Sequence, residues 1–150
     1  MTESICRFPF VSAPQYQKSE GTMPFQVTSI YAAMIVLGVL ILSNVVSANR
    51  GRTGTSIYHG EDQRLGLAVR RHGNLVENAA LAMLMLALCE ARGLPGWGLH
   101  TLGLILVASR IAHAIGLDAD NPMKPLRIAG GAGTQLVLLA TAGYLLWSQF

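Results

Sequence analysis

The chain has 150 residues, of which 11 are basic and 8 acidic, so charged residues make up only 13% of it. Soluble domains usually carry about 25% charged residues. Apolar residues account for 51% of the chain and its mean hydropathy is +0.42, which leaves too few polar residues to cover a soluble surface. The composition therefore argues against a soluble globular domain, a disordered chain and a disulfide scaffold, and it predicts a small polytopic membrane protein.

The stretch before Met23 differs from the rest of the chain. Residues 1–22 carry four charged side chains and two prolines, and no apolar run among them is long enough for the core of a signal peptide. Two interpretations stay open. Residues 1–22 form a flexible polar tail, or the natural protein starts at Met23, directly before the first apolar run. In both, residues 23–150 form one domain.

Runs without charged residues predict where the chain crosses the membrane. One run covers 21–49 and ends before Arg50, another covers 93–109 and ends before Arg110, and a third covers 128–150. A helix needs about 20 apolar residues to span a bilayer core. A fourth span is charged in its first half, which we expect neighbouring helices to protect, and apolar in its second half. An all-α membrane bundle of four helices is predicted, at about 24–48, 64–91, 97–117 and 126–148.

Basic residues gather in two of the three predicted loops. Arg50, Arg52 and Arg64 lie between the first two spans, and Lys124 and Arg127 lie between the last two. Because short loops rich in Lys and Arg stay on the cytoplasmic side of a membrane, both loops are predicted to face the cytoplasm. The isoelectric point near 9.2 follows from this asymmetry, so no nucleic-acid partner is needed to explain it.

Polar residues form a stripe along the helix predicted at 64–91. Arg70, Asn74, Glu77 and Asn78 follow the spacing i, i+4, i+7, i+8, so they share one helical face. Ionisable groups inside a membrane are costly and normally face a bundle interior or a cavity. One interpretation is structural, an internal ion pair with amides that join neighbouring helices. The other interpretation is a binding site.

Further basic residues are predicted at the same level of the membrane. Arg110 and His113 are neighbours on one face of the third span, and Arg127 stands at the start of the fourth. Taken alone, Arg127 fits a side chain that reaches lipid headgroups, which is common. Together with Arg50 and Arg70, however, Arg110 and Arg127 make a cluster of four guanidiniums.

The mixture of charges indicates a class of ligand. Arg binds carboxylates through two parallel hydrogen bonds, so the guanidinium cluster suits a small polyanion. Glu77 is the natural counter-ion for an amine on the same ligand, and glutathione combines two carboxylates with one ammonium. The four histidines have no cysteine partner at metal-ligand spacing, so no metal site is predicted.

The motif in the second span resembles the signature of a known family. Arg70-x-x-x-Asn74-x-x-Glu77, within R-R-H-G-N-L-V-E-N, is similar to the second helix of the MAPEG superfamily, the membrane-associated proteins of eicosanoid and glutathione metabolism. Residues 46–50 and 109–116 strengthen the resemblance, which covers about 24–150. The H-G-N variant with a later Arg-x-x-His is most similar to the bacterial inner-membrane branch.

The resemblance implies a homotrimer in which glutathione, the co-substrate, binds between adjacent subunits near the cytoplasmic face. It implies a glutathione-dependent transferase or peroxidase for lipophilic electrophiles or hydroperoxides, in which Arg127 stabilises the nucleophilic thiolate. By position, the residues that match glutathione contacts are Arg50, Arg70, Asn74, Glu77, Asn78, Arg110 and His113.

Two other classes of protein stay open. Asn78, His113 and Leu117 stand where tyrosines are expected from the family, so the alternative is a non-enzymatic trimeric lipid-binding or scaffold protein that keeps the fold. A small transporter or channel subunit fits less well, because the charges collect on one side of the membrane instead of lining a path to its midplane. The glycine-rich stretch 129–133 lacks the Lys-Ser/Thr of a phosphate loop and is expected to allow close helix packing.

Overall fold

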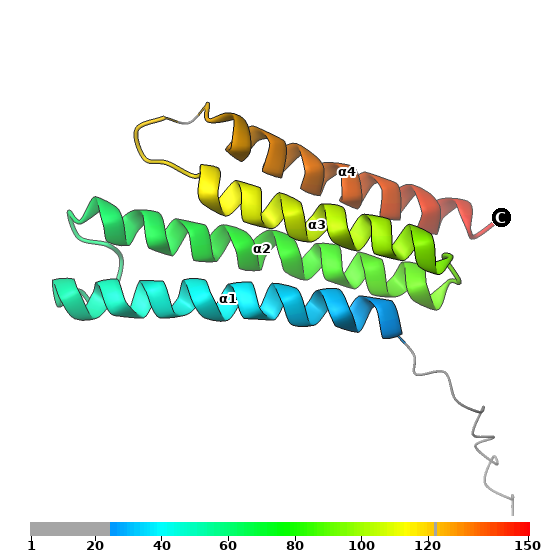
Figure 1. The fold of residues 1–150 in the computed structure, drawn as a ribbon, viewed down its shortest axis with the longest axis horizontal. Helices are drawn as coiled ribbons and strands as arrows, with labels where there is room; N and C mark the ends of the chain where they lie inside the picture. The colour runs from blue at the N-terminus through cyan, green and yellow to red at the C-terminus, as the bar shows by residue number, and fades with distance from the viewer. Residues whose placement is uncertain (1–24, 122) are drawn as a thin grey trace, which may run out of the picture.

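The computed structural model describes residues 25–121 and 123–150. These residues form four antiparallel helices and no strand (Figure 1): α1 (Gln26–Thr53), α2 (Gln63–Ala91), α3 (Gly96–Gly116) and α4 (Pro125–Trp147). Each helix is long and apolar enough to cross a membrane. The predicted all-α membrane bundle of four helices is therefore confirmed. The polar tail predicted at 1–22 lies outside the described residues.

The helix bounds lie close to the charge-free runs. α2, α3 and α4 each begin and end within one residue of the expected positions, whereas α1 continues past residue 48 to Thr53. α1 ends where Gly54 adopts a left-handed conformation (φ 67°) and donates its N–H to the Arg50 carbonyl at 2.9 Å. The charge pattern thus marks the edge of the apolar run, while the helix itself continues into the polar loop.

α2 and α3 lie at the centre of the bundle, with α1 and α4 on opposite sides of them (Figure 1). Fully buried side chains between the helices include Leu86 of α2, Leu106 of α3 and Val137 of α4. Lipid tails are as apolar as these side chains, so the helices are held together by close van der Waals packing more than by transfer out of water.

Small residues allow α3 to approach its neighbours closely. A side-chain carbon on Gly130 would collide with backbone atoms of Ser109 and His113, and one on Gly103 would collide with the ring of Tyr31. The close packing predicted for the glycine-rich start of α4 is therefore confirmed at Gly130. These contacts fix how α4 lies on α3, and so they determine where the basic start of α4 lies.

A carboxylate from α2 holds the start of α1. Glu90 accepts hydrogen bonds from the backbone N–H groups of Val27 at 2.9 Å and Thr28 at 2.8 Å. The first N–H groups of a helix have no partners within it, and the helix dipole favours a negative charge beside them. At the same end, Tyr31 Oη lies 3.0 Å from His100 Nδ1. We call the other end of the bundle, which holds the α1–α2 and α3–α4 loops, the basic end.

Candidate functional site

A charged pair lies on an exposed face of α2. Arg70 Nη1 is 3.6 Å from Glu77 Oε1, and the two side chains are 62% and 59% exposed. α2 begins at Gln63, and Glu77 lies about 21 Å from Gln63 along the helix axis. The Glu77 side chain therefore starts deep inside the span, and the described residues leave more than half of it exposed. Bare charges are unfavourable in lipid, so this face is complementary to a polar partner.

Arg110 joins three helices inside the bundle. The residue is 4% exposed, and its Nη1 donates to Asn74 Oδ1 of α2 at 3.1 Å while its Nη2 donates to the Gly130 carbonyl of α4 at 2.9 Å. Asn78 donates to the Asn74 carbonyl within α2 at 2.9 Å. Asn74 thus joins α2 to α3 through its side-chain amide, as the structural interpretation of the stripe predicts. Glu77, in contrast, pairs with Arg70 on the exposed face.

A pocket at the basic end contains both Arg70 and Arg127, and its volume is about 280 Å³. Pro125 at the start of α4 has a backbone φ that suits a first helical turn, and that turn carries Arg127. The Arg127 carbonyl lies 3.1 Å from His113 Nδ1, which ties α4 to the end of α3. The pocket is lined by His59, Gln63, Gly66, Leu67, Arg70, Leu117, Asp118, Ala119 and Arg127.

The four guanidiniums that were predicted to form one cluster lie in three different environments: a loop, the bundle interior and a pocket. Arg50 Nη1 donates to three carbonyl oxygens of the α1–α2 loop, the shortest bond being that to Ser56 at 2.8 Å. Arg110 is bound inside the bundle, and only Arg70 and Arg127 share a pocket. Within one chain, therefore, two of the four guanidiniums line the same pocket.

Two loop carboxylates at the basic end, Asp118 and Asp62, already have partners. Asp118 pairs with Lys124 and accepts backbone N–H bonds, and these interactions lower the pKa of Asp118 to about 2. Asp62 accepts from the Leu65 N–H at 2.7 Å as the N-cap of α2, and from Arg52 at 2.8 Å, so its pKa is also lowered. Neither carboxylate is free to neutralise the two guanidiniums of the pocket. No three His, Cys, Asp or Glu side chains gather as a metal site within the described part of the chain.

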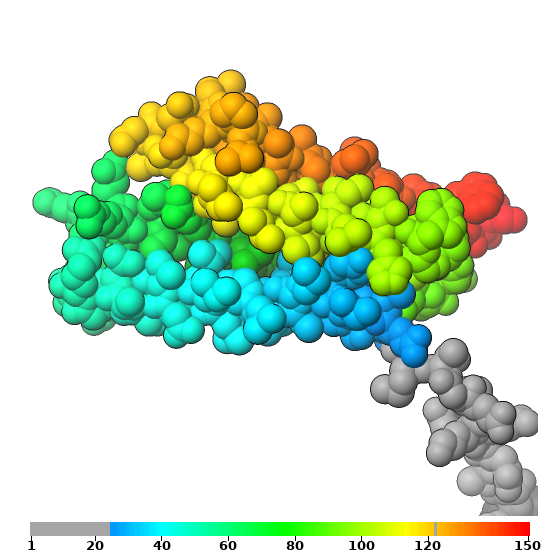
Figure 2. All heavy atoms as spheres, viewed as in Figure 1, coloured from blue at the N-terminus to red at the C-terminus, as the bar shows by residue number. Residues whose placement is uncertain are grey.

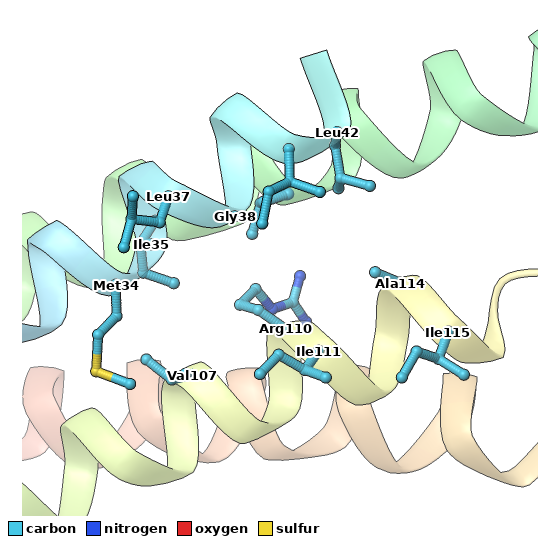
Figure 3. Close-up of a pocket in the computed structure, with 12 residues that line it drawn as sticks. Met34, Ile35, Leu37, Gly38, Leu42, Val107, Arg110, Ile111, Ala114 and Ile115 are labelled. Carbon is cyan, nitrogen blue, oxygen red and sulfur yellow. The ribbon is translucent and has the colours of Figure 1, made fainter. Parts of the chain in front are cut away.

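A second cavity is a groove between α1 and α3 with a volume of about 430 Å³. Figure 2 shows the face of the molecule on which these two helices lie side by side. The walls are apolar except for Arg110, whose guanidinium points into the space between the helices (Figure 3). Lining residues such as Leu37, Ile41 and Ile111 are exposed, so the groove opens to the surroundings of the bundle.

Two polar contacts at the end of the bundle opposite the basic end were not predicted from the sequence: that of Glu90 with the start of α1, and that of Tyr31 with His100. The charge pattern predicts only that Glu90 lies within a span. No Lys or Arg lies three or four positions from Glu90 in the sequence, so no ion pair within α2 is available, and this indicates a partner on another helix. Tyr31 and His100 lie near the starts of α1 and α3, and an up-and-down topology brings those starts to the same end of the bundle.

The chain is similar to proteins of one family along most of its length. Residues 28–147 match the model of the MAPEG family. The chain belongs to the MAPEG family. Two similar relatives of this MAPEG protein are the inner membrane proteins YecN of Escherichia coli K12 and of Escherichia coli O6:H1 strain CFT073. Each is 28% identical over 125 residues, which cover 81% of this chain and 94% of the relative. No solved structure matches the chain.

These comparisons confirm two predictions made from the sequence. The resemblance of the second span to MAPEG proteins is confirmed by the family match. The inner-membrane location is confirmed by the relatives together with the four apolar helices. This MAPEG protein is therefore a multi-pass protein of the inner membrane.

Proposed function

We propose that this MAPEG protein is a membrane-bound glutathione transferase or peroxidase that acts on lipophilic electrophiles or hydroperoxides. The observation that carries the proposal is the Arg70–Glu77 pair, which exposes one cation and one anion on α2 inside the membrane span. Arg70 also lines the pocket that contains Arg127. A ligand at this place meets two guanidiniums and the Glu77 carboxylate, which lies beside one of them.

Glutathione has the functional groups that this arrangement can bind. A guanidinium binds a carboxylate through two hydrogen bonds, and the Glu77 carboxylate is complementary to the ammonium group. The backbones of Arg70 and Glu77 are two helical turns apart, about 10 Å along a helix, and their charged groups meet between them at 3.6 Å. Three extended residues reach a similar length, about 10 Å. One tripeptide can therefore contact both ends of the charged pair.

A second copy of the chain is proposed to complete the site. Ionised side chains at the centre of a bilayer cost about 2.5–3.5 kcal/mol each on insertion scales. A homotrimer in which the Arg70–Glu77 face meets a neighbouring copy removes both charges from lipid, and glutathione then lies between subunits. With the α1–α2 and α3–α4 loops in the cytoplasm, as their basic residues favour, the pocket opens to the compartment that holds the glutathione pool.

Arg127 is proposed to activate the thiol. A free thiol has a pKa of about 8.5 and is mostly protonated at neutral pH, and an adjacent guanidinium favours the thiolate. In transfer, the thiolate sulfur attacks an electrophilic carbon, a C–S bond forms, and the leaving group departs with its electron pair. In peroxide reduction, two glutathione molecules supply two electrons and become a disulfide, while the hydroperoxide becomes an alcohol and water.

Activity of the full-length protein in nonionic detergent tests the proposal. The protein is incubated with glutathione and either chlorodinitrobenzene or a lipid hydroperoxide, and turnover above the uncatalysed rate is expected. Loss of a charge that stabilises the reacting anion should lower the rate about a hundredfold in Arg127→Ala. Arg92→Ala, at the opposite end of the bundle, is the matched control and should keep the rate. Equal rates in the two variants would contradict the role of Arg127.

One observation favours the alternative, a non-enzymatic trimeric lipid-binding or scaffold protein. Arg50, Asn74 and Arg110 are three of the predicted glutathione contacts, and their side chains are hydrogen-bonded within the chain. A protein that forms trimers, binds no glutathione and shows no turnover with either substrate would be this alternative.

A further inference from the structure

The pocket at the basic end contains a histidine that the proposed glutathione chemistry leaves without a role. His59 comes from the α1–α2 loop and lines the pocket of about 280 Å³ together with Arg70 of α2 and Arg127 of α4. This volume holds about nine water molecules at about 30 Å³ each, so a small group beside Arg127 is also close to the His59 ring. The pocket therefore brings together one imidazole and two guanidiniums.

The backbone just before His59 is held in an unfavourable conformation. Tyr58 adopts the left-handed region (φ 58°), which is costly for a residue with a large side chain. The Tyr58 side chain is 82% exposed, so its own packing does not offset this cost. Arg50 Nη1 holds the loop by donating to three carbonyl oxygens at 2.8–3.2 Å, those of Thr55, Ser56 and Tyr58. Strained residues that their surroundings hold in place cluster at functional sites, and here the strain fixes the position of His59.

Gly66 of α2 leaves room for the His59 ring beside the helix. A side-chain carbon on Gly66 would lie 3.3 Å from His59 Cγ and 3.5 Å from His59 Nδ1, so the ring packs against the backbone of α2. The His59 carbonyl also accepts from the Asp62 N–H at 3.1 Å, next to the start of the helix. Because Gly66 and Arg70 are four residues apart, they share one helical face, and His59 and Arg70 reach the pocket side by side.

His59 is the lining group best suited to carry a proton at neutral pH. The two guanidiniums stay protonated. Asp118 also lines the pocket, but the ion pair with Lys124 and the backbone N–H bonds lower the pKa of Asp118 to about 2, so this carboxylate is a weak base. The other lining side chains in the described part of the chain do not titrate. An imidazole both accepts and donates protons near neutral pH, which is what general acid–base catalysis needs.

We propose that His59 is a catalytic acid–base of the glutathione reaction, which accepts the thiol proton and returns it to the leaving group. The inference rests on the proposed function and adds the path of the proton to it. The neutral His59 imidazole takes the proton of the glutathione thiol, and the Arg127 guanidinium stabilises the thiolate. With a hydroperoxide, the sulfur bonds to the terminal oxygen, the O–O bond breaks, and the imidazolium protonates the departing alkoxide to an alcohol. A second glutathione then converts the sulfenic acid to the disulfide and water.

Two substrates that differ in the leaving group test the proposal. Turnover of the full-length protein in nonionic detergent is measured with cumene hydroperoxide, whose alkoxide must gain a proton, and with chlorodinitrobenzene, whose chloride leaves without one. In His59→Ala, kcat should fall about a hundredfold with the hydroperoxide and only about tenfold with chlorodinitrobenzene. The KM for glutathione should change less than about twofold, because the proton transfer takes place after binding. Free imidazole should restore the hydroperoxide rate of His59→Ala by about tenfold or more. The matched control Glu61→Ala, in the same exposed loop, should keep both rates.

A second variant displaces the imidazole without removing it. Arg50→Gln takes away the donor that holds the loop carbonyls, so it should lower kcat with the hydroperoxide. Because Arg50 is then a positioning residue that acts through His59, the double variant Arg50→Gln/His59→Ala should be no slower than His59→Ala alone.

Three results would overturn the proposal. Equal rates in His59→Ala and Glu61→Ala would remove His59 from the reaction and leave the glutathione chemistry standing. Equal losses with the two substrates and no recovery in imidazole would show that His59 only supports the loop. An unchanged protein that turns over neither substrate would overturn this role and the proposed function together. The expected pattern, a larger loss with the hydroperoxide that imidazole reverses, supports the proposal.

Discussion

The Arg70 guanidinium and the Glu77 carboxylate form an ion pair at 3.6 Å across two turns of α2, and more than half of each side chain is exposed. In water such an exposed pair contributes little to stability. Inside a membrane span, the same exposure places two charges against lipid, which is unfavourable. The pair is therefore best understood as part of an interface that a second copy and a polar ligand complete.

Reversing the charge of Glu77 is expected to break the assembly. Glu77→Lys places two cations side by side on the face that we propose meets a neighbouring copy, so the interface gains repulsion and loses its ion pair. Light scattering in detergent should give three copies for the unchanged protein and one copy for the variant. Glu61→Lys, in the exposed α1–α2 loop, should remain a trimer. Trimers of Glu77→Lys would contradict the proposed interface.

Gly103 is expected to tolerate no side chain. The Tyr31 ring occupies the place of its missing Cβ, so Gly103→Ala must push α1 and α3 apart, at a cost of about 1–3 kcal/mol in the free energy of unfolding. Gly143→Ala is the matched control, since a Cβ added there meets no atom within 4 Å. The higher helix propensity of Ala should raise the free energy of unfolding of this variant by up to about 1 kcal/mol. Unfolding by a denaturing detergent measures both. Equal stability of the two variants would refute the close contact.

Loss of the Glu90 carboxylate is expected to free the start of α1. Glu90→Ala leaves the Val27 and Thr28 N–H groups without their acceptor, which should lower the free energy of unfolding by about 1.5–3 kcal/mol. Glu90→Gln keeps one acceptor and should lose less. Hydrogen exchange at the first turn of α1 should rise in both variants and stay unchanged in Glu61→Ala. Unchanged exchange in Glu90→Ala would rule out this anchor.

The fold could be predicted from the sequence because a membrane span needs about 20 apolar residues and charges interrupt such runs. The charge-free stretches before Arg50 and Arg110 each correspond to one helix. The rotation of the helices about their own axes could not be predicted. The pattern of Arg70, Asn74 and Glu77 correctly predicts a stripe on α2, but the structure divides it between an exposed ion pair and a contact with Arg110.

The candidate site could be predicted only in part, for the same reason. Periodicity shows which residues share a face, and not which neighbour covers that face. Arg70 and Arg127 line one pocket, but Arg50 is held by carbonyl oxygens of its own loop after the turn at Gly54. The lack of a Lys or Arg near Glu90 on α2 indicates a partner on another helix, but the partners themselves could not be predicted because they are backbone N–H groups.

The loop between α3 and α4 should contribute stability that depends on pH. The ion pair with Lys124 and the backbone bonds lower the pKa of Asp118 from 3.8 to about 2. A carboxyl group whose pKa is lower in the folded state contributes stability above its unfolded pKa, and this contribution is lost as the pH falls through the folded value. The difference in thermal midpoint between the unchanged protein and Asp118→Asn should therefore be constant above pH 3.8 and shrink toward about pH 2. A constant difference at all pH values would contradict the assignment.

Calorimetric titration of the detergent-purified full-length protein with glutathione, beside Glu77→Gln and Arg127→Ala, tests whether these residues form a glutathione site. We expect saturable binding with a Kd between about 1 μM and 1 mM, at least about tenfold weaker in Glu77→Gln because the ammonium group loses its counter-ion. In Arg127→Ala, the ultraviolet absorbance of the bound thiolate should disappear. Absence of binding at several millimolar glutathione, or equal binding by Glu77→Gln, would contradict a glutathione site at the Arg70–Glu77 pair.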